Sequence, residues 1–144
     1  GYGVAVESSG RAWVCGITPS KDFPGVSSGY QSIHGGGNTD GFISVFTPAG
    51  ALEWSTYLGG ASSDAVSAIS VSSGFAAFTG NTYSTNFPVT SGALQSTRAG
   101  EYDAIWGVFP VTSTTPLYLS YLGGTSSDGG LGVAAGAFSA RRRR

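Results

Sequence analysis

The sequence predicts an all-β protein made of repeated four-stranded units, and three observations lead to this prediction. First, residues 56–64 (TYLGGASSD) return as residues 120–128 (SYLGGTSSD), 64 positions later, and repetition on this scale indicates stacked structural units. Second, short apolar runs recur at regular spacing between turn sequences, as in sheets of short strands. Third, Gly, Pro or β-branched residues interrupt nearly every candidate helix, so no window of about 11 residues has helical periodicity.

Each unit contains four apolar runs that predict four strands. In the first unit these runs lie at residues 1–6, 12–15, 42–46 and 52–58, and in the second at 69–71, 75–78, 105–109 and 117–122. Gly, Ser and Pro between the runs predict turns, because Gly tolerates positive φ and Ser can bond its own backbone. A long irregular segment separates the second run from the third in both units and predicts a long loop.

A third copy of the repeat begins at Gly129, where residues 131–134 predict its first strand. Four short strands joined up and down form the blade of a β-propeller, so we expect each full repeat to be one blade. The predicted organisation is a repeat at residues 1–64, a repeat at 65–128, a partial third repeat at 129–140 and an arginine tail at 141–144.

Composition favours a secreted or cell-surface protein. Charged residues make up only 10% of the chain, against about 25% in an average soluble domain, so hydroxyl and backbone groups must supply most of the polar surface. Outside the arginine tail, the sequence has three basic residues and eight carboxylates. It therefore has no basic stripe along which a nucleic acid could bind. No apolar run approaches the roughly 20 residues of a membrane-spanning helix. We therefore expect an extracellular or cell-surface location, no nucleic-acid partner and no membrane span.

Two features leave alternatives open. The four arginines at 141–144 fit a solvated tail or a sequence artefact, or a contact with nucleic acid, an acidic surface or a processing protease. Cys15 is the only cysteine, so an internal disulfide is excluded. We expect either a buried, inert thiol or a bridge between two chains.

Several motifs resemble those of a known repeat family. They are the TYLGG run followed by Asp, residues 80–88 (GNTYSTNFP), residues 92–95 (GALQ), and Asp103-Ala104 before an apolar run. Together they are similar to the bacterial β-propeller repeat family called SBBP, more closely in the second unit than in the first, where residues 17–24 read ITPSKDFP. The resemblance covers both full units and the start of the third. It implies propeller blades, usually within large extracytoplasmic proteins, and it implies no activity.

Two blades cannot close a propeller ring, and an open pair leaves apolar faces and strand edges bare. The sequence therefore predicts partners, either further copies of the chain or the rest of a longer propeller chain. Head-to-tail contacts between copies give a closed ring or an open filament, depending on their geometry. Residues 131–134 are expected to complete a neighbour's sheet by strand addition, with Leu131, Val133 and Ala134 as the assembly residues.

No catalytic constellation, metal site or cofactor is predicted. His34 is the only histidine; a catalytic His needs an activated nucleophile and an orienting acid, and a metal site needs further ligands, so we expect an exposed loop side chain. The carboxylates recur in register, Asp64 with Asp128 and Asp40 with Asp103. We expect them to cap turns by accepting backbone N–H bonds. Calcium coordination by Asn38 and Asp40 stays an alternative.

Aromatic residues and the two long loops supply the remaining candidates. Tyr57 and Tyr121 occupy matching strand ends, where we expect packing between units, and Trp13 and Trp106 are predicted core residues. The long loops are expected to project from the same face of both blades and to carry ligand-binding residues. These candidates are Asp22, Tyr30 and His34 in the first loop and Tyr83, Asn86, Arg98 and Tyr102 in the second.

The sequence thus predicts a non-catalytic, extracellular structural protein that self-assembles through blade packing and strand complementation. The alternative is a carbohydrate- or surface-binding propeller module whose long loops offer aromatic rings as stacking platforms. A hydrolase that uses His34 or the carboxylates ranks last, because the sequence does not place the partners of such a site together.

Overall fold

The chain forms two four-stranded antiparallel sheets, and in each sheet the strands follow one another in chain order. The computed structural model describes residues 1–136. The first sheet contains β1 (Gly3–Val6), β2 (Ala12–Thr18), β3 (Asp40–Phe46) and β4 (Leu52–Leu58), and the second contains β5 (Asp64–Ser72), β6 (Phe75–Thr82), β7 (Asp103–Pro110) and β8 (Tyr118–Leu122). A single turn of 3-10 helix, η1 (Val26–Ser28), lies in the first long loop. The all-β prediction and the two four-stranded units are confirmed.

The strand boundaries differ from the prediction mainly at β5. This strand begins at Asp64, five residues before the predicted run at 69–71, so Asp64 opens the second sheet instead of closing the first unit. The backbone explains the extension, because Asp64 pairs with Thr82 of β6 and its N–H donates to the carbonyl of Thr39 at 2.8 Å. Polar residues interrupt the apolar pattern at this end of β5, so the pattern did not predict a strand there.

Residues 131–134, expected as the first strand of a third repeat, form no strand within the described chain. A strand needs a hydrogen-bonded neighbour, and in both complete units the first strand pairs with the second through a hairpin. The matching partner in a third unit would lie beyond residue 136. The remainder of the predicted third repeat and the arginine tail lie outside the described residues.

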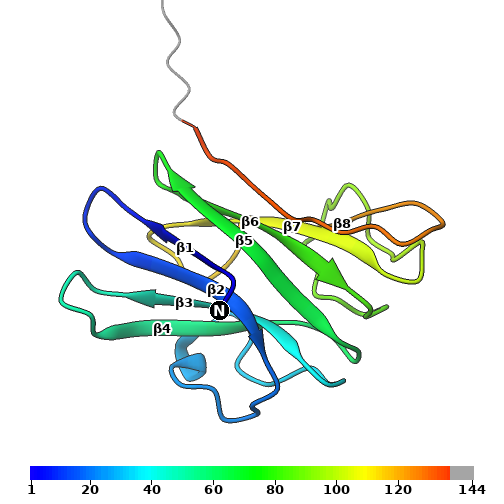
Figure 1. Ribbon diagram of the computed structural model, residues 1–144, viewed down its shortest axis with the longest axis horizontal. Coiled ribbons are helices and arrows are strands. Elements are labelled where there is room, and N and C mark those ends of the chain that lie inside the picture. Colours follow the sequence, from blue (N-terminus) through cyan, green and yellow to red (C-terminus); the bar gives the residue numbers. More distant parts are fainter. Residues whose placement is uncertain (137–144) are drawn as a thin grey trace, which may run out of the picture.

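The two sheets stack with an apolar core between them, and Figure 1 shows β5 lying over β1 and β2. The two tryptophans of the first sheet, Trp13 and Trp54, meet edge to face with ring centroids 5.5 Å apart. Phe109 of β7 packs against both rings, with its centroid 6.5 Å from that of Trp13 and 6.0 Å from that of Trp54. This aromatic cluster joins the sheets, and it confirms Trp13 as a core residue.

Trp106 is not a core residue, in contrast to the prediction. Successive residues of a strand point to opposite faces, and in β7 it is Ile105 and Phe109 that are fully buried toward the core. Trp106 lies on the opposite face of the second sheet, partly exposed, where it packs on Tyr118 with ring centroids 4.5 Å apart. The sequence did not reveal which face of this strand is covered.

The long loops fold back along the last strand of their own sheet instead of projecting freely. In the first unit the N–H groups of Ser55 and Tyr57 in β4 donate to loop carbonyls at 3.0 Å. In the second unit the N–H of Tyr121 in β8 donates to the carbonyl of Gln95 at 3.2 Å. Each loop therefore supplies the bonding partners that the outer strand of its sheet otherwise lacks.

The matching tyrosines hold these loops. The hydroxyl of Tyr57 donates to the carbonyl of Ser20 at 2.8 Å and accepts the N–H of Phe23 at 3.1 Å. The hydroxyl of Tyr121 makes the same two bonds in the second unit, with Ser84 and Phe87. Packing between units was the predicted role of both tyrosines; their buried hydroxyls instead anchor the loop of their own unit.

We expect Phe109→Ala to lower the free energy of unfolding by about 3–5 kcal/mol, because it removes a fully buried ring from the contact between the sheets and leaves a cavity. Urea unfolding followed by tryptophan fluorescence measures the change. Phe75→Ala is the control: this ring is 44% exposed, and its removal should change stability by less than about 1 kcal/mol. Equal losses for the two variants would contradict the described packing.

Candidate functional site

The junction between the two units is built by backbone segments that approach each other closely. The glycine run at residues 35–37 lies against the turn at residues 59–63, and a Cβ added at Gly35 would stand 2.5 Å from the carbonyl oxygen of Gly60. Gly37 has a φ of +60°, which glycine adopts without strain. Side chains are therefore excluded along this contact, and the loop of the first unit can dock on the start of the second.

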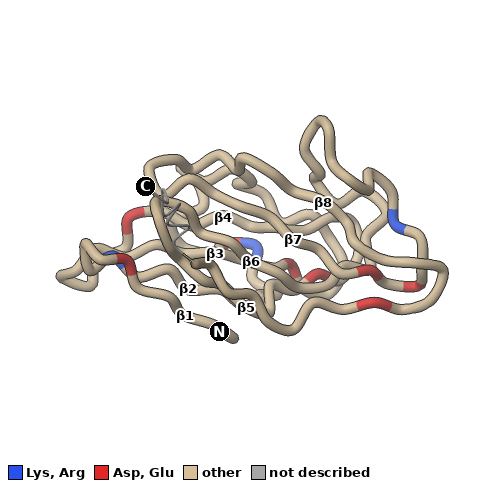
Figure 2. Tube along the Cα trace, turned by 90° about the horizontal axis from the view of Figure 1, so that it is seen from above, with Lys and Arg blue, Asp and Glu red and all other residues tan. Residues whose placement is uncertain are grey.

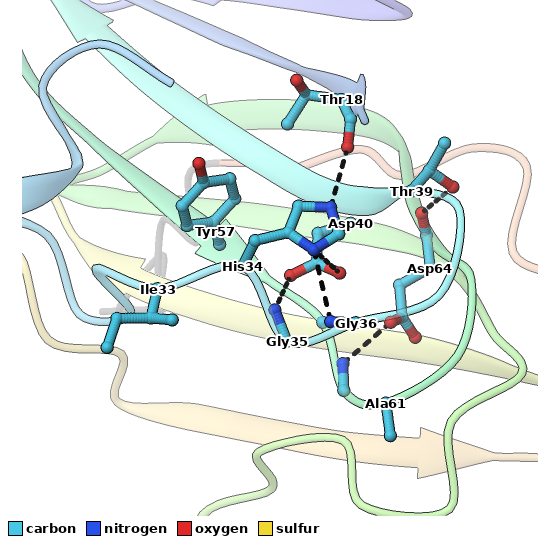
Figure 3. Close-up of polar contacts among 12 residues, drawn as sticks. Thr18, Ile33, His34, Gly35, Gly36, Thr39, Asp40, Tyr57, Ala61 and Asp64 are labelled. Atoms are coloured by element: carbon cyan, nitrogen blue, oxygen red, sulfur yellow. Dashed lines mark hydrogen bonds and ion pairs between the residues drawn. The ribbon is translucent and has the colours of Figure 1, made fainter. Parts of the chain in front are cut away.

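His34 precedes the glycine run and is buried against strands of its own unit, so the expectation of an exposed loop side chain is wrong. Its side chain is 2% exposed, and that of the neighbouring Asp40 is fully buried. Nε2 lies 3.3 Å from the carbonyl oxygen of Thr18, and the ring meets that of Tyr57 edge to face at 5.5 Å. Figure 3 shows the imidazole between Thr18, Tyr57 and Asp40. The docking of the glycine run places the ring there, and no local sequence pattern signals it.

The His34–Asp40 pair holds the loop in place. Nδ1 of His34 lies 3.5 Å from Oδ1 of Asp40, and that oxygen makes no hydrogen bond within the described chain. The other carboxylate oxygen accepts the N–H of Gly35 at 2.6 Å. Burial raises the pKa of Asp40, while the bond from Gly35 and the nearby imidazole oppose that rise. Nδ1 of His34 accepts the N–H of Gly36 at 3.2 Å, so the ring and the carboxylate both bond to the glycine run.

Asp64 is the second buried carboxylate at the junction. Its Oδ2 accepts the N–H of Gly60 at 2.8 Å and the hydroxyl of Ser84 at 2.9 Å, and Oδ1 accepts the hydroxyl of Thr82. Burial raises the pKa of this carboxyl to about 6, although these three bonds work in the opposite direction. The side chain is 1% exposed, so it binds the two units together and is closed to solvent.

The predicted turn-capping role of the repeated carboxylates is confirmed. Asp128 repeats the contact of Asp64, because its Oδ2 accepts the N–H of Gly124 at 2.8 Å. Asp103 accepts the N–H groups of Ala99 at 2.8 Å and Gly100 at 2.9 Å. These bonds recur at matching positions of the two units, as expected for a structural role.

Three predicted binding residues of the second loop come together at the junction. The rings of Tyr83 and Tyr102 lie 4.9 Å apart, and Nη1 of Arg98 donates to the carbonyl oxygen of Tyr83 at 2.6 Å. Asn86 lies nearby, since its Oδ1 accepts the N–H of Ala61 from the 59–63 turn at 2.8 Å. Tyr83 is 40% exposed, so the group offers one accessible aromatic ring.

The other predicted residues are not part of this group. Asp22 and Tyr30 are exposed in the first loop and line neither of the hollows at the junction. Among the predicted assembly residues, Leu131 is 88% exposed, Ala134 is also exposed, and Val133 is partly buried. The predicted binding residues of the two long loops therefore do not form one continuous surface.

Two adjoining hollows open on either side of Tyr83, with volumes of about 310 and 380 Å³. Both are lined by Ser63 and Tyr83; Asn81 borders the first, and Asn38 and Ser62 border the second. The sequence did not predict the serines and Asn81 as residues of this site, because they lie outside the long loops. One signal was present: Pro19 stands in the first unit where the second has Tyr83, so this tyrosine is not a repeated packing residue.

One catalytic motif that the sequence contains does not form its usual structure. Residues 25–29 (GVSSG) have the Gly-x-Ser-x-Gly spacing of a nucleophile elbow, which requires a sharp turn from a strand into a helix. Ser27 lies instead on the three-residue η1 inside a loop. No hydrogen bond joins it to His34, whose Nε2 faces the carbonyl of Thr18.

The described residues also bear on metals, membranes and the cysteine. Within residues 1–136, no three His, Cys, Asp or Glu side chains are grouped so that they could hold a metal ion. In the same part of the chain, no helix is long and apolar enough to cross a membrane. Cys15 is buried and free, and burial raises the pKa of its thiol to about 11, which favours the inert thiol over the bridge between chains.

We expect Asp64→Asn to change how stability depends on pH. The pKa of Asp64 is about 6 in the folded chain, against an ordinary value of 3.8, so the folded state binds its proton more tightly than the unfolded state. This group therefore favours folding most at acidic pH, and that contribution is lost as the pH rises through about 6. Between about pH 4.5 and about pH 7.5 the loss amounts to about 2 kcal/mol.

Urea unfolding of both proteins at the two pH values tests this expectation. Wild type should lose about 2 kcal/mol more than Asp64→Asn on going from the acidic to the neutral condition. Asp128→Asn, which changes the matching but partly exposed cap, should follow wild type. Parallel pH profiles for wild type and Asp64→Asn would show that this carboxylate is not held as described.

Comparisons with known proteins add no family to this picture. No model of a protein family matches the sequence, and no curated protein matches it either. The likeness to the SBBP repeat therefore rests on the motifs at residues 56–64, 80–88 and 92–95 and on their recurrence.

Proposed function

We propose that the chain is a non-catalytic, extracellular structural protein whose two units are propeller blades that stack on further blades. Copies of the chain, or the rest of a longer chain, supply those blades. One observation carries the proposal: positions that are buried in one unit by contact with the other are left exposed in their repeat counterparts. The chain therefore has one open face at each end.

The first open face lies on the second sheet. In the first sheet, Val45 and Leu58 are fully buried at the contact with the second sheet. Their counterparts in the second sheet point away from that contact; Val108 is partly exposed and Leu122 is 51% exposed. We call this surface the leading face, and it consists of Ala77, Trp106, Val108, Tyr118 and Leu122.

The second open face lies on the first sheet. Phe78 and Phe109 are fully buried where the second sheet meets the first. Their counterparts Val14 and Phe46 face outward and are partly exposed. On the same face, Val4 is paired with Val14 and is 65% exposed. We call this surface the trailing face, and it consists of Val4, Val6, Val14 and Phe46.

The contact inside the chain is the template for a contact between chains. Within one chain, the side of the first sheet that matches the leading face packs on the side of the second sheet that matches the trailing face. The leading face of one copy should therefore fit the trailing face of another in the same way. The charged residues inside the strands are Asp40, Glu53, Asp64 and Asp103, each at the first or second position of its strand, and Figure 2 shows the charged residues along the chain trace. No like-charge repulsion between the sheet faces therefore opposes such stacking. A head-to-tail contact of this type closes a ring or extends a filament, and three or four copies would give a propeller of the usual blade number.

The segment after β8 supports strand complementation in this assembly. The N–H of Asp128 donates to the carbonyl of Tyr102 at 2.9 Å, which repeats the bond from Asp64 to Thr39 that opens β5. The segment at residues 129–136 thus begins in the same way as β5, the first strand of the second unit. Within the described chain Leu131 is exposed to solvent. We propose that residues 131–134 pair with β2 of the next copy in place of its own short β1, by strand addition.

The non-catalytic and extracellular parts of the proposal have separate support. His34, Asp40 and Asp64 are closed to solvent and hold the junction through the bonds described above, which is a structural use of groups that could otherwise carry chemistry. The low content of charged side chains, 10% of the chain, fits a surface of hydroxyl and backbone groups. Such a surface is typical of exported repeat proteins with β-sheets.

The test is to block each face separately and then mix the two variants. Val14→Arg blocks the trailing face, and Leu122→Arg blocks the leading face; both positions are at least partly exposed, so neither change disturbs the core. Wild type should sediment as assemblies larger than one chain, and each variant alone should be monomeric. An equimolar mixture should form a one-to-one dimer, since each variant keeps the face that the other lacks.

Two outcomes would overturn the proposal. A wild-type chain that stays monomeric at the highest soluble concentration would overturn the assembly of copies of this chain. Assembly by either variant alone would mean that the contact is not between a leading and a trailing face. Ile33→Arg, at a 77% exposed position in the first long loop and outside both faces, is the control and should assemble as wild type does.

A further inference from the structure

We infer that the junction between the two units binds a neutral sugar chain, with Tyr83 as the stacking platform. This site is independent of the two assembly faces, because it lies where the loops of the two units meet inside one chain. Three properties of the junction support this inference: a fixed aromatic ring, unused polar groups beside it, and the absence of an accessible charge among the residues that line it.

The ring of Tyr83 is accessible and held in place. It is 40% exposed, and the ring of Tyr102 supports it at 4.9 Å. Its backbone is fixed at both ends, because its N–H donates to the carbonyl of Ser63 at 2.9 Å and its carbonyl accepts from Arg98 at 2.6 Å. A rigid tyrosine with one free face loses little entropy when a flat, apolar sugar face stacks on it.

Polar side chains flank the ring in both hollows. Ser62, Ser63, Asn38 and Asn81 line the hollows, and their hydroxyl and amide groups make no side-chain hydrogen bonds within the described residues. Amides and hydroxyls both donate and accept. They therefore match the hydroxyl groups of a sugar, each of which also does both.

The lining offers no accessible charge. Asp64 is the one ionisable carboxyl that borders the hollows, and it is 1% exposed with both oxygens bonded to Gly60, Thr82 and Ser84. Nη1 of the nearby Arg98 is engaged by the carbonyl oxygens of Tyr83 and Glu101. A neutral, hydroxylated ligand suits these surroundings better than an acidic or basic one.

The size and place of the hollows favour more than one sugar ring. At about 310 and 380 Å³ each reaches the lower range of small-ligand sites, and the two meet at Ser63 and Tyr83. The repeat does not reproduce the site, because Glu101 and Pro19 stand at the positions that match Asn38 and Tyr83. It thus forms only where the first unit meets the second.

The experiment uses the full chain and an array of oligosaccharides that contains neutral glucans, xylans, mannans and chitin fragments together with acidic pectin fragments. Wild type should bind at least one neutral class, and calorimetry with that oligosaccharide should give a saturable isotherm. Tyr83→Ala should weaken binding about tenfold or more, because it removes the stacking platform. Tyr30→Ala changes a tyrosine of similar exposure, 39%, away from the junction, and should leave binding unchanged.

Two further readouts separate this site from folding and from assembly. Tyr83→Ala should keep the circular dichroism and the assembly state of wild type, because this partly exposed ring lies outside the core and outside both faces. The monomeric variant Leu122→Arg should bind the sugar as wild type does. Absence of neutral oligosaccharide binding, preference for acidic fragments, or equal binding by Tyr83→Ala would overturn the inference.

Discussion

The contact between the inner faces of the two sheets is the constraint on which the rest of the structure depends. A four-stranded sheet with apolar residues on both sides cannot be stable alone in water, and here one side of each sheet is closed by the other through Trp13, Trp54 and Phe109. The opposite sides carry the same repeat positions without a second sheet over them, and on the second sheet, among the described residues, only the segment after β8 crosses that side, at Gly80 and Ser70. The repeat therefore fixes a direction in the chain, from a trailing side to a leading side, and this polarity is the physical basis of the proposed stacking.

The same contact sets the chemistry of the junction. Stacking brings the glycine run of one unit against the turn at residues 59–63 and removes Asp40 and Asp64 from water. A buried carboxylate is unfavourable unless hydrogen bonds compensate it. Both oxygens of Asp64 accept hydrogen bonds, whereas Asp40 accepts through one oxygen and holds the other 3.5 Å from Nδ1 of His34. The loops of the junction then place Tyr83 and the flanking amides at the surface. A structural contact between units thus also creates the hollows in which a ligand is proposed to bind.

Local patterns in the sequence predicted the features that local interactions determine. The strands followed from alternating apolar runs, and the turn caps followed from aspartates at matching positions such as Asp64 and Asp128. Features that depend on distant segments were not predictable. His34 is buried because the first long loop folds back on β2, β3 and β4 of its own unit. Trp106 is partly exposed because no sheet covers that side of β7, and Tyr57 anchors a loop more than 30 positions earlier in the chain. The serines and Asn81 that line the hollows were not predicted, because the hollows exist only in the folded junction.

The loops that run along β4 and β8 have a consequence for how such a protein behaves at high concentration. They occupy the backbone groups of Ser55, Tyr57 and Tyr121, which on a bare outer strand would recruit strands from other molecules and seed amyloid-like sheets. In the proposed stack the edge formed by β4 and β8 is therefore closed to further strands. Growth by stacking is then separated from amyloid-like pairing at that edge of the sheets.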